Sequence, residues 1–208
     1  DRLWNFIFTQ FNIYMYGKDN MKKLDKYVGR RRSWSRQQMP RADALFLQQC
    51  VPGFNYPEYQ PPNSIDIGAI LPRKAGELPE DIQNFIKKYD KVVYFAFGTL
   101  QPVDKLERII EEFSKLENIG FIISSKQETK LRASNVLTLA WAPQNDILGH
   151  PSTKLFINHG GWNSVLEGAY HGVPMLVCGW AWDRRLNAKL IEYRHIGLAL
   201  IDEEEATP

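Results

Sequence analysis

The residues best suited to chemistry lie at 141–187, and their centre is the run His-Gly-Gly-Trp-Asn-Ser at 159–164. An apolar segment predicts a buried strand at 154–158 before this run, and a helix is expected at 165–170, with the Asn or the Ser of the run as its cap. The two glycines allow a tight turn and a close approach of the backbone to a ligand. A strand, a glycine turn and a helix start bring unpaired N–H groups together, which favours an anion by about 0.3 to 1 kcal/mol. The run therefore predicts a phosphate-binding turn.

The neighbouring side chains strengthen this prediction, because a Gly-Gly turn alone is more often an ordinary connection in an α/β fold than a ligand site. His159 offers a ring N–H beside the turn, and Asn163 and Ser164 add side-chain donors. Glu167 lies one helical turn further along the same face. A carboxylate at that position can accept hydrogen bonds from both hydroxyls of a ribose.

Polar and aromatic residues on either side of the turn extend the site. Trp141 follows an apolar segment at 136–139 and offers a flat ring on which a base can stack, for about 1 to 3 kcal/mol. Gln144 carries an amide that can hydrogen bond to a base edge. Asp183 and Arg184 open a helix after the next apolar strand. A nucleotide's base, ribose, diphosphate and sugar would thus be met in turn.

Together these motifs resemble the donor-binding signature of family-1 UDP-sugar glycosyltransferases, which include the animal UDP-glucuronosyltransferases and the plant glucosyltransferases. The motifs, in order and at the expected spacing, are Trp-Ala-Pro-Gln, Gly-His-Pro, His-Gly-Gly-Trp-Asn-Ser, Glu, His-Gly-Val-Pro-Met and Asp-x-x-x-Asn-Ala. The resemblance is strong across 91–197 and weaker across 1–70. It implies an inverting, metal-independent transfer of a hexose or hexuronic acid from UDP-glucose or UDP-glucuronate to a hydroxyl of a small lipophilic acceptor, with no cofactor.

The resemblance also implies a role for each matching residue. Trp141 would stack on uracil, Gln144 would contact the uridine and Glu167 would bind the ribose hydroxyls. The polar residues of the His-Gly-Gly-Trp-Asn-Ser run would hold the diphosphate, and Asp183 would hold hydroxyls of the sugar. The complete set expected to bind the donor is Gly98, Thr99, Trp141, Gln144, His159, Gly161, Trp162, Asn163, Ser164, Glu167, Asp183 and Arg184.

Two parts of this set leave alternatives open. The family usually has Gln after the sugar-binding acid, whereas this chain has Arg184, which can pair with a glucuronate carboxylate or point into solvent. Gly98 and Thr99 follow the apolar segment at 91–97 and can form a structural turn or a second phosphate or sugar contact. The resemblance favours the contact.

No residue of this chain matches the family's catalytic base, a histidine oriented by an aspartate in the N-terminal domain. We expect that base upstream of Asp1, and we expect this chain, as a fragment, to bind a UDP-sugar with little or no turnover. The alternative is a non-catalytic UDP-binding protein, such as a truncated isoform or partner subunit. An NAD-binding oxidoreductase is disfavoured, because no Gly-x-Gly-x-x-Gly follows the strand at 91–97.

The remaining histidines favour structural roles. His150 is expected to end a short helix, His171 to end the helix before Gly172, and His195 to lie near the end of the helix that starts at Asp183. No two histidines have metal-ligand spacing, and none is matched with Ser and Asp as a nucleophile set. The sequence therefore predicts no metal site.

Alternating apolar and amphipathic segments predict an α/β fold with a parallel, doubly wound sheet and ligands at the carboxyl ends of its strands. By resemblance this is the Rossmann-like C-terminal half of a GT-B-type glycosyltransferase. We expect residues 1–64 to be the end of an N-terminal acceptor-side domain with the interdomain linker, and 65–208 to be the UDP-sugar-binding domain. Further strands are expected at 65–71, 119–124 and 175–178, with helices at 80–89 and, after Pro102, along a core stripe of Leu106, Ile109, Ile110, Phe113 and Leu116.

Composition is that of an ordinary soluble globular protein, with 208 residues, 44% hydrophobic residues and a net charge of +2. Residues 1–16 have apolar side chains at helical spacing, and packing in a core is favoured over a membrane interface. Residues 18–41 hold nine Lys or Arg against two Asp. A solvated face is favoured there over binding of nucleic acid or an anionic membrane. Cys50 and Cys178 are expected to be free thiols.

The chain has no run of about 18 apolar residues, the length that a membrane span needs. Any membrane association would therefore come through parts outside this chain. A glucuronosyltransferase-type protein would be expected at the endoplasmic reticulum membrane, and a glucosyltransferase-type protein in the cytoplasm.

Overall fold

The computed structural model describes residues 45–55, 63–70, 74–97, 106–179 and 183–201. Contacts divide the chain into two units, 1–46 and 47–208. The expected helix at 1–16, the basic run at 18–41, and Gly98 and Thr99 lie outside the described residues. The domain boundary expected after residue 64 stays a prediction.

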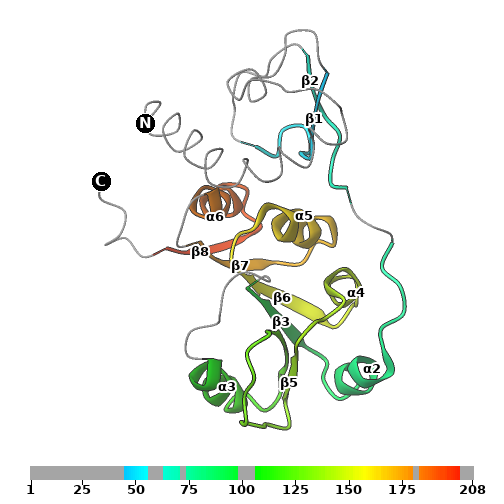
Figure 1. The fold of residues 1–208 in the computed structure, drawn as a ribbon, viewed down its shortest axis with the longest axis vertical. Coiled ribbons are helices and arrows are strands. Elements are labelled where there is room, and N and C mark those ends of the chain that lie inside the picture. Colours follow the sequence, from blue (N-terminus) through cyan, green and yellow to red (C-terminus); the bar gives the residue numbers. More distant parts are fainter. Residues whose placement is uncertain (1–44, 56–62, 71–73, 98–105, 180–182, 202–208) are drawn as a thin grey trace, which may run out of the picture. The chain divides into compact units, whose positions relative to one another are not determined.

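Six parallel strands form one sheet in the order β5-β4-β3-β6-β7-β8 (Figure 1). Their bounds are β3 (Val92–Ala96), β4 (Gly120–Ser124), β5 (Val136–Leu139), β6 (Thr153–Asn158), β7 (Met175–Cys178) and β8 (Gly197–Leu200). From β3 the chain builds outward through β4 to β5, then returns to the other side of β3 with β6 and continues outward to β8. The expected doubly wound sheet is confirmed, and its topological switch point lies between β3 and β6.

The central strand β3 explains why the sheet is covered on both sides. All five of its residues are buried, and such a continuous apolar run is typical of a parallel strand with helices on both faces. At its carboxyl end Ala96 pairs with Ser124 of β4 and with Asn158 of β6. The three strands therefore end level with one another, at the edge where a ligand would meet the sheet.

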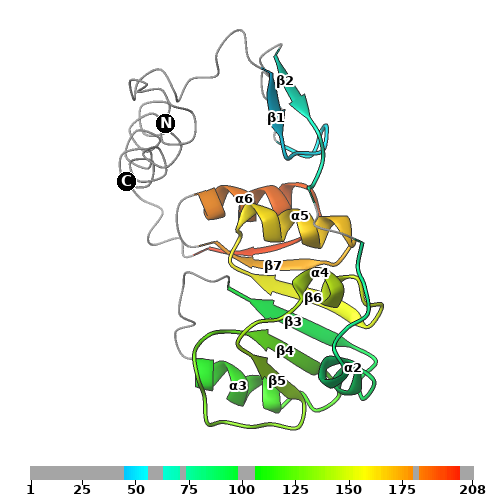
Figure 2. The same cartoon turned by 45° about the vertical axis from the view of Figure 1, so that its right-hand side comes forward.

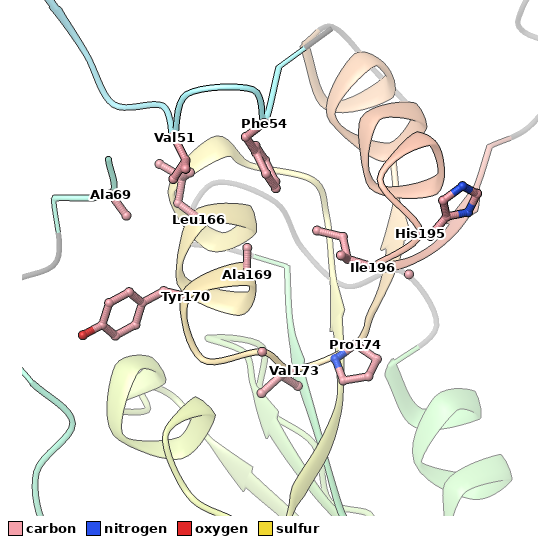
Figure 3. A pocket seen from close by; sticks show the side chains of 12 residues that line it. Val51, Phe54, Ala69, Leu166, Ala169, Tyr170, Val173, Pro174, His195 and Ile196 are labelled. Atoms are coloured by element: carbon pink, nitrogen blue, oxygen red, sulfur yellow. The ribbon is translucent and has the colours of Figure 1, made fainter. Parts of the chain in front are cut away.

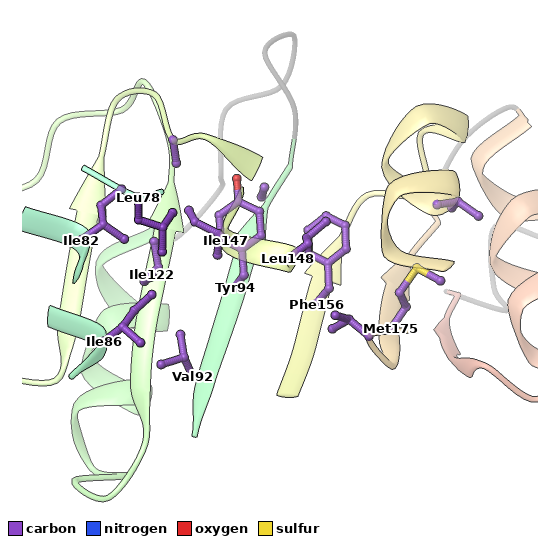
Figure 4. Close-up of a cluster of buried hydrophobic side chains, with 14 of the residues drawn as sticks. Leu78, Ile82, Ile86, Val92, Tyr94, Ile122, Ile147, Leu148, Phe156 and Met175 are labelled. Atoms are coloured by element: carbon purple, nitrogen blue, oxygen red, sulfur yellow. The ribbon is translucent and has the colours of Figure 1, made fainter. Parts of the chain in front are cut away.

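Five helices of the described chain surround the sheet (Figure 2): α2 (Glu80–Ile86), α3 (Leu106–Ser114), α4 (Gln144–Leu148), α5 (Trp162–Tyr170) and α6 (Asp183–Tyr193). Helices α2, α4, α5 and α6 share one core with Tyr94 and Phe156 (Figure 4), whose rings stack with centroids 5.3 Å apart. Helix α3 packs with Val93 and Phe95 instead. Because successive strand residues point to opposite faces, α3 covers the other face of β3.

A separate two-stranded sheet joins β1 (Phe46–Gln48) to β2 (Ser64–Asp66). The strand expected at 65–71 is therefore wrong in extent. Gly68 has a positive φ of 79°, a left-handed conformation that takes the chain out of the strand direction.

Three expectations about helices are also wrong. Helix α5 begins at Trp162 rather than Val165, and its N-cap is Gly161 without any side-chain cap, so neither Asn163 nor Ser164 caps it. Leu116 is 50% exposed because α3 ends at Ser114, before the apolar stripe reaches it. Helix α2 likewise ends at Ile86. The sequence pattern predicted which faces of the helices are apolar, but not the residues at which the helices begin and end.

Asn135 illustrates how the loops are held. Its side chain is 2% exposed, and its amide nitrogen donates to the carbonyl oxygens of Phe113, Leu116 and Ile119 at 2.9, 3.1 and 3.3 Å. The carbonyl groups at the end of α3 are thereby satisfied. Within the described ranges, no helix combines the length and apolarity that crossing a bilayer requires.

Candidate functional site

The glycine turn after β6 lies at the switch point of the sheet. Gly160 has a φ of 82°, and a Cβ atom there would lie 2.9 Å from the Arg184 carbonyl oxygen and 3.0 Å from Val177 Cγ1. Glycine is therefore needed both for its conformation and for the close approach of the turn to the start of α6. The expected tight turn is present, and the close approach of its backbone to a ligand stays a prediction.

Helix α5 starts directly from this turn. Its first helical hydrogen bond runs from the Val165 N–H to the Gly161 carbonyl oxygen, at 3.0 Å. The N–H groups of the residues before Val165 consequently have no partner within the helix, and no side chain caps it. The positive end of the α5 dipole therefore lies beside the carboxyl ends of β3 and β6.

Two buried polar atoms at the turn lack a hydrogen-bond partner among the described residues. They are Asn158 Nδ2, in a side chain that is fully buried, and His159 Nδ1. An unpaired buried polar group costs about 1 to 3 kcal/mol. Because native proteins rarely carry such a cost without a use, the two atoms point to a partner that the site acquires.

The ring of His159 stays neutral near neutral pH. Burial is the main cause that lowers its pKa, and the positive charge of Arg184 lowers it further, against smaller opposite effects of the Ala96 backbone and the Asp183 carboxylate. The charges of Arg184 and Asp183 are thus close enough to act on the turn. The structure therefore brings the first residues of α6 close to the turn, and their joint role in binding stays a prediction.

A second polar group joins α4 to α5. Gln144 Nε2 donates to Glu167 Oε2 at 2.7 Å and to Ser164 Oγ at 3.4 Å. The structure therefore brings together three residues that the sequence assigned to the nucleoside and diphosphate. This hydrogen bond uses one of the two oxygens of the Glu167 carboxylate.

Trp141 lies in the loop between β5 and α4 and is 74% exposed. The next residue, Ala142, is buried and anchors the loop. The indole is therefore open to stacking, which needs an accessible ring face.

Trp162 differs from its neighbours, because its side chain faces another part of the chain. The indole N–H donates to the Gln49 carbonyl oxygen at 2.8 Å, and the ring lies 6.0 Å from that of Phe54. Its backbone N–H, at the first position of α5, belongs to the turn. Sequence reasoning did not identify Gln49, since it lies 113 residues away.

An apolar cavity of about 610 Å³ lies elsewhere (Figure 3). It includes Pro174 and Gly197, at the amino ends of β7 and β8, and is therefore on the opposite edge of the sheet from the turn. Phe54, Leu166 and Ile196 are among its apolar walls. Such a lining offers few donors to a diphosphate.

No group of three or more His, Cys, Asp or Glu residues within the described part of the chain is arranged to hold a metal ion.

Comparison with known proteins gives a consistent family. The family model described as "UDP-glucoronosyl and UDP-glucosyl transferase" matches residues 1–206. UDP-glucuronosyltransferase 3A2 of Mus musculus is 33% identical over 67% of this chain and 28% of its own length. UDP-glycosyltransferase UGT5 of Dactylopius coccus is 30% identical over 95% of this chain and 39% of its own length.

A solved structure, Arabidopsis thaliana UGT89C1 complexed with UDP, is similar in fold. It has 24% sequence identity and a TM-score of 0.54, over 66% of this chain and 38% of that chain. The chain thus spans about a third of the length of the relatives it matches.

The lowered pKa of His159 predicts a contribution to the pH dependence of stability. The unfolded chain takes up a proton on this residue near pH 6.5 before the folded chain does, so stability should fall as the pH drops below that value. Urea unfolding of the unaltered chain and of His159→Gln, between about pH 7 and about pH 5, measures how much His159 contributes to the pH dependence of the free energy of unfolding. The decrease in the free energy of unfolding over this pH range should be smaller in His159→Gln.

The pKa values of His150 and His171 are also lowered by burial, but both residues are present in the two proteins and do not affect the difference. An equal or steeper decline in His159→Gln would contradict the assignment.

Proposed function

Because the chain belongs to the UDP-glucoronosyl and UDP-glucosyl transferase family, we propose that it supplies the UDP-sugar site of an inverting, metal-independent glycosyltransferase. The sheet of the described residues is the Rossmann-like domain of a GT-B-type fold. The acceptor we propose is a small lipophilic molecule with a hydroxyl group. The catalytic base would come from residues outside this chain.

The observation that carries the proposal is the α5 N-terminus at the switch point, beside two buried polar atoms, Asn158 Nδ2 and His159 Nδ1, that have no partner among the described residues. A diphosphate would offer several oxygen acceptors to these N–H groups and would lie at the positive end of the helix dipole. The backbone N–H groups at the start of α5 and the side chains of His159, Asn163 and Ser164 would hold it. No metal ion is needed for this neutralisation.

The nucleoside would bind beside the diphosphate. Glu167 now accepts a hydrogen bond from Gln144, and in the complex its carboxylate would accept bonds from the ribose hydroxyls. Gln144 would then be released toward the uridine, with uracil stacked on Trp141. The Arabidopsis thaliana protein of similar fold was solved in complex with UDP, which supports the proposal that this chain binds a pyrimidine nucleotide.

The site would act by stabilising the leaving group. As the bond between the sugar and the phosphate breaks, negative charge develops on the departing UDP. Fixed N–H donors and the neutral His159 ring would stabilise that charge without reorganising. The acceptor oxygen attacks the opposite side of the sugar carbon and loses its proton to the base outside this chain, which inverts the configuration at that carbon.

The sugar would lie toward α6. We propose that Asp183 holds sugar hydroxyls and that Arg184, whose charge lowers the pKa of His159, lies close enough to meet a group on the sugar. UDP-glucuronate would offer it a carboxylate, whereas UDP-glucose would not. The second candidate function is UDP binding without turnover, since no residue of this chain matches the motif of the family's catalytic base.

Titration calorimetry of the 208-residue chain with UDP tests the function, with NAD as the matched control ligand. UDP should bind equally with magnesium and with a chelator, and NAD should not bind. Release of UDP from a UDP-sugar in the presence of a lipophilic phenol would then separate the transferase from the binding protein. Absence of UDP binding would refute both.

Glu167→Ala should weaken UDP binding by about 1 to 3 kcal/mol, because the ribose hydroxyls lose their acceptor. Calorimetry with UDP gives the change. A UDP analogue without the two ribose hydroxyls should bind both proteins alike, and Glu111→Ala, at an exposed position of α3, serves as the control. Unchanged UDP affinity in Glu167→Ala would remove this residue from the ribose site.

Arg184→Gln should shift the donor preference from UDP-glucuronate toward UDP-glucose, because the guanidinium that pairs with a carboxylate is lost. Competition of the two donors against labelled UDP measures the preference. Arg185→Gln, the same change at the next position, should leave it unaltered. If Arg184→Gln leaves the ratio of affinities as it was, Arg184 does not contact the sugar.

A further inference from the structure

We infer that Asn158 and Asn187 are positioning residues, which hold Gly160 so that the following N–H groups face the donor's diphosphate. The inference rests on the proposed function and gives a role to two residues of the same site for which the sequence motifs assigned none. Both act on the turn through hydrogen bonds to the backbone of Gly160.

Asn158 fixes the amide side of Gly160. Its Oδ1 accepts a hydrogen bond from the Gly160 N–H at 2.9 Å. This bond reaches two residues forward, the pattern by which Asn stabilises a turn locally. It supports the left-handed conformation of Gly160, whose φ is 82°. It also removes the Gly160 N–H from the set available to a ligand, so that the diphosphate must meet the N–H groups further along.

Asn187 fixes the carbonyl side of the same residue. Its Nδ2 donates to the Gly160 carbonyl oxygen at 2.8 Å, from helix α6 and 27 residues away. A carbonyl oxygen turned toward a phosphate would repel it, because both carry negative charge. By binding this oxygen, Asn187 keeps it directed toward α6. Only the positive end of the turn is then presented to the anion.

A comparison with Asn135 separates this role from ordinary loop support. Asn135 is also buried, but its amide nitrogen donates to three carbonyl groups. Asn158 is fully buried and uses its oxygen within the turn, while its Nδ2 has no partner among the described residues. An asparagine that served the fold alone would be expected to satisfy both groups.

The position of Asn187 adds a link to the sugar. It lies four residues after Asp183 on α6, so the two side chains share one face of the helix. The residue proposed for the sugar and the residue that holds the turn are therefore part of one rigid element. Asn187 sets the distance between the diphosphate and the sugar subsites.

The test compares UDP with uridine, which lacks the diphosphate, in a matched pair of variants. Asn158→Thr keeps an oxygen that can accept a hydrogen bond from the Gly160 N–H. Asn158→Val introduces a side chain of nearly the same shape as Thr but without that oxygen. In calorimetry, Asn158→Val should bind UDP about 10-fold more weakly, the loss expected for one hydrogen bond, with uridine unchanged. Asn158→Thr should stay closer to the unaltered chain.

Asn187→Leu should give the same selective loss for UDP. Because both side chains act on one residue, the losses of the double variant should not add. Asn135→Ala controls for stability, since it lowers the free energy of unfolding without touching the turn. Its UDP affinity should be unchanged. If Asn158→Val does not fold, Asn158→Thr and Asn187→Leu provide the comparison.

Equal losses for UDP and uridine, or no loss for UDP in either Asn158→Val or Asn187→Leu, would overturn the inference. A failure of the unaltered chain to bind UDP would instead overturn the proposed function itself, and the inference with it. The two failures are therefore distinguishable in the first titration.

Discussion

The reversal of strand order between β3 and β6 is the constraint on which the site depends. Chain connections leave these neighbouring strands in opposite directions along the sheet, so the loops that follow them diverge and leave the strand ends open. Hydrogen bonds across the central strand keep Ala96 level with Asn158. The loop that follows β6 therefore begins at the carboxyl ends of the two strands, between the diverging loops. The glycine turn occupies that place.

The turn solves a problem of polar groups. A helix that starts inside a folded domain leaves N–H groups without helical partners, and burial makes each of them costly. Helix α5 has no side-chain cap at its N-terminus, and each of the two residues before the glycines carries a buried polar atom without a partner in the described part of the chain. In this fold the cost of burying unpaired polar groups falls on the turn before α5. An anion of two phosphates would satisfy several of these groups at once, so the same feature that weakens the empty protein would favour the complex.

The side chains around the turn divide according to what they bind. Asn187 and Trp162 bind backbone carbonyl groups of the protein, at Gly160 and Gln49. Gln144 and Glu167 bind each other, a bond that a ribose could replace. Under the proposed function, stabilisation of the site and recognition of the ligand would therefore be carried by different side chains. Within the His-Gly-Gly-Trp-Asn-Ser run they would be carried by different parts of Trp162, its side chain and its backbone.

The sequence by itself determined the parallel sheet and the edge at which the candidate site lies. Strands at 136–139 and 175–178 have the predicted bounds, because a short, mostly apolar run between turns is a local property of the sequence. Helix ends and long-range partners were decided only by the tertiary structure. The start of α5 followed from the extended backbone of Gly161, and the bonds of Trp162 and Asn187 reach 113 and 27 residues along the chain. Such partners depend on which loops the sheet brings together, and no local pattern of residues records that.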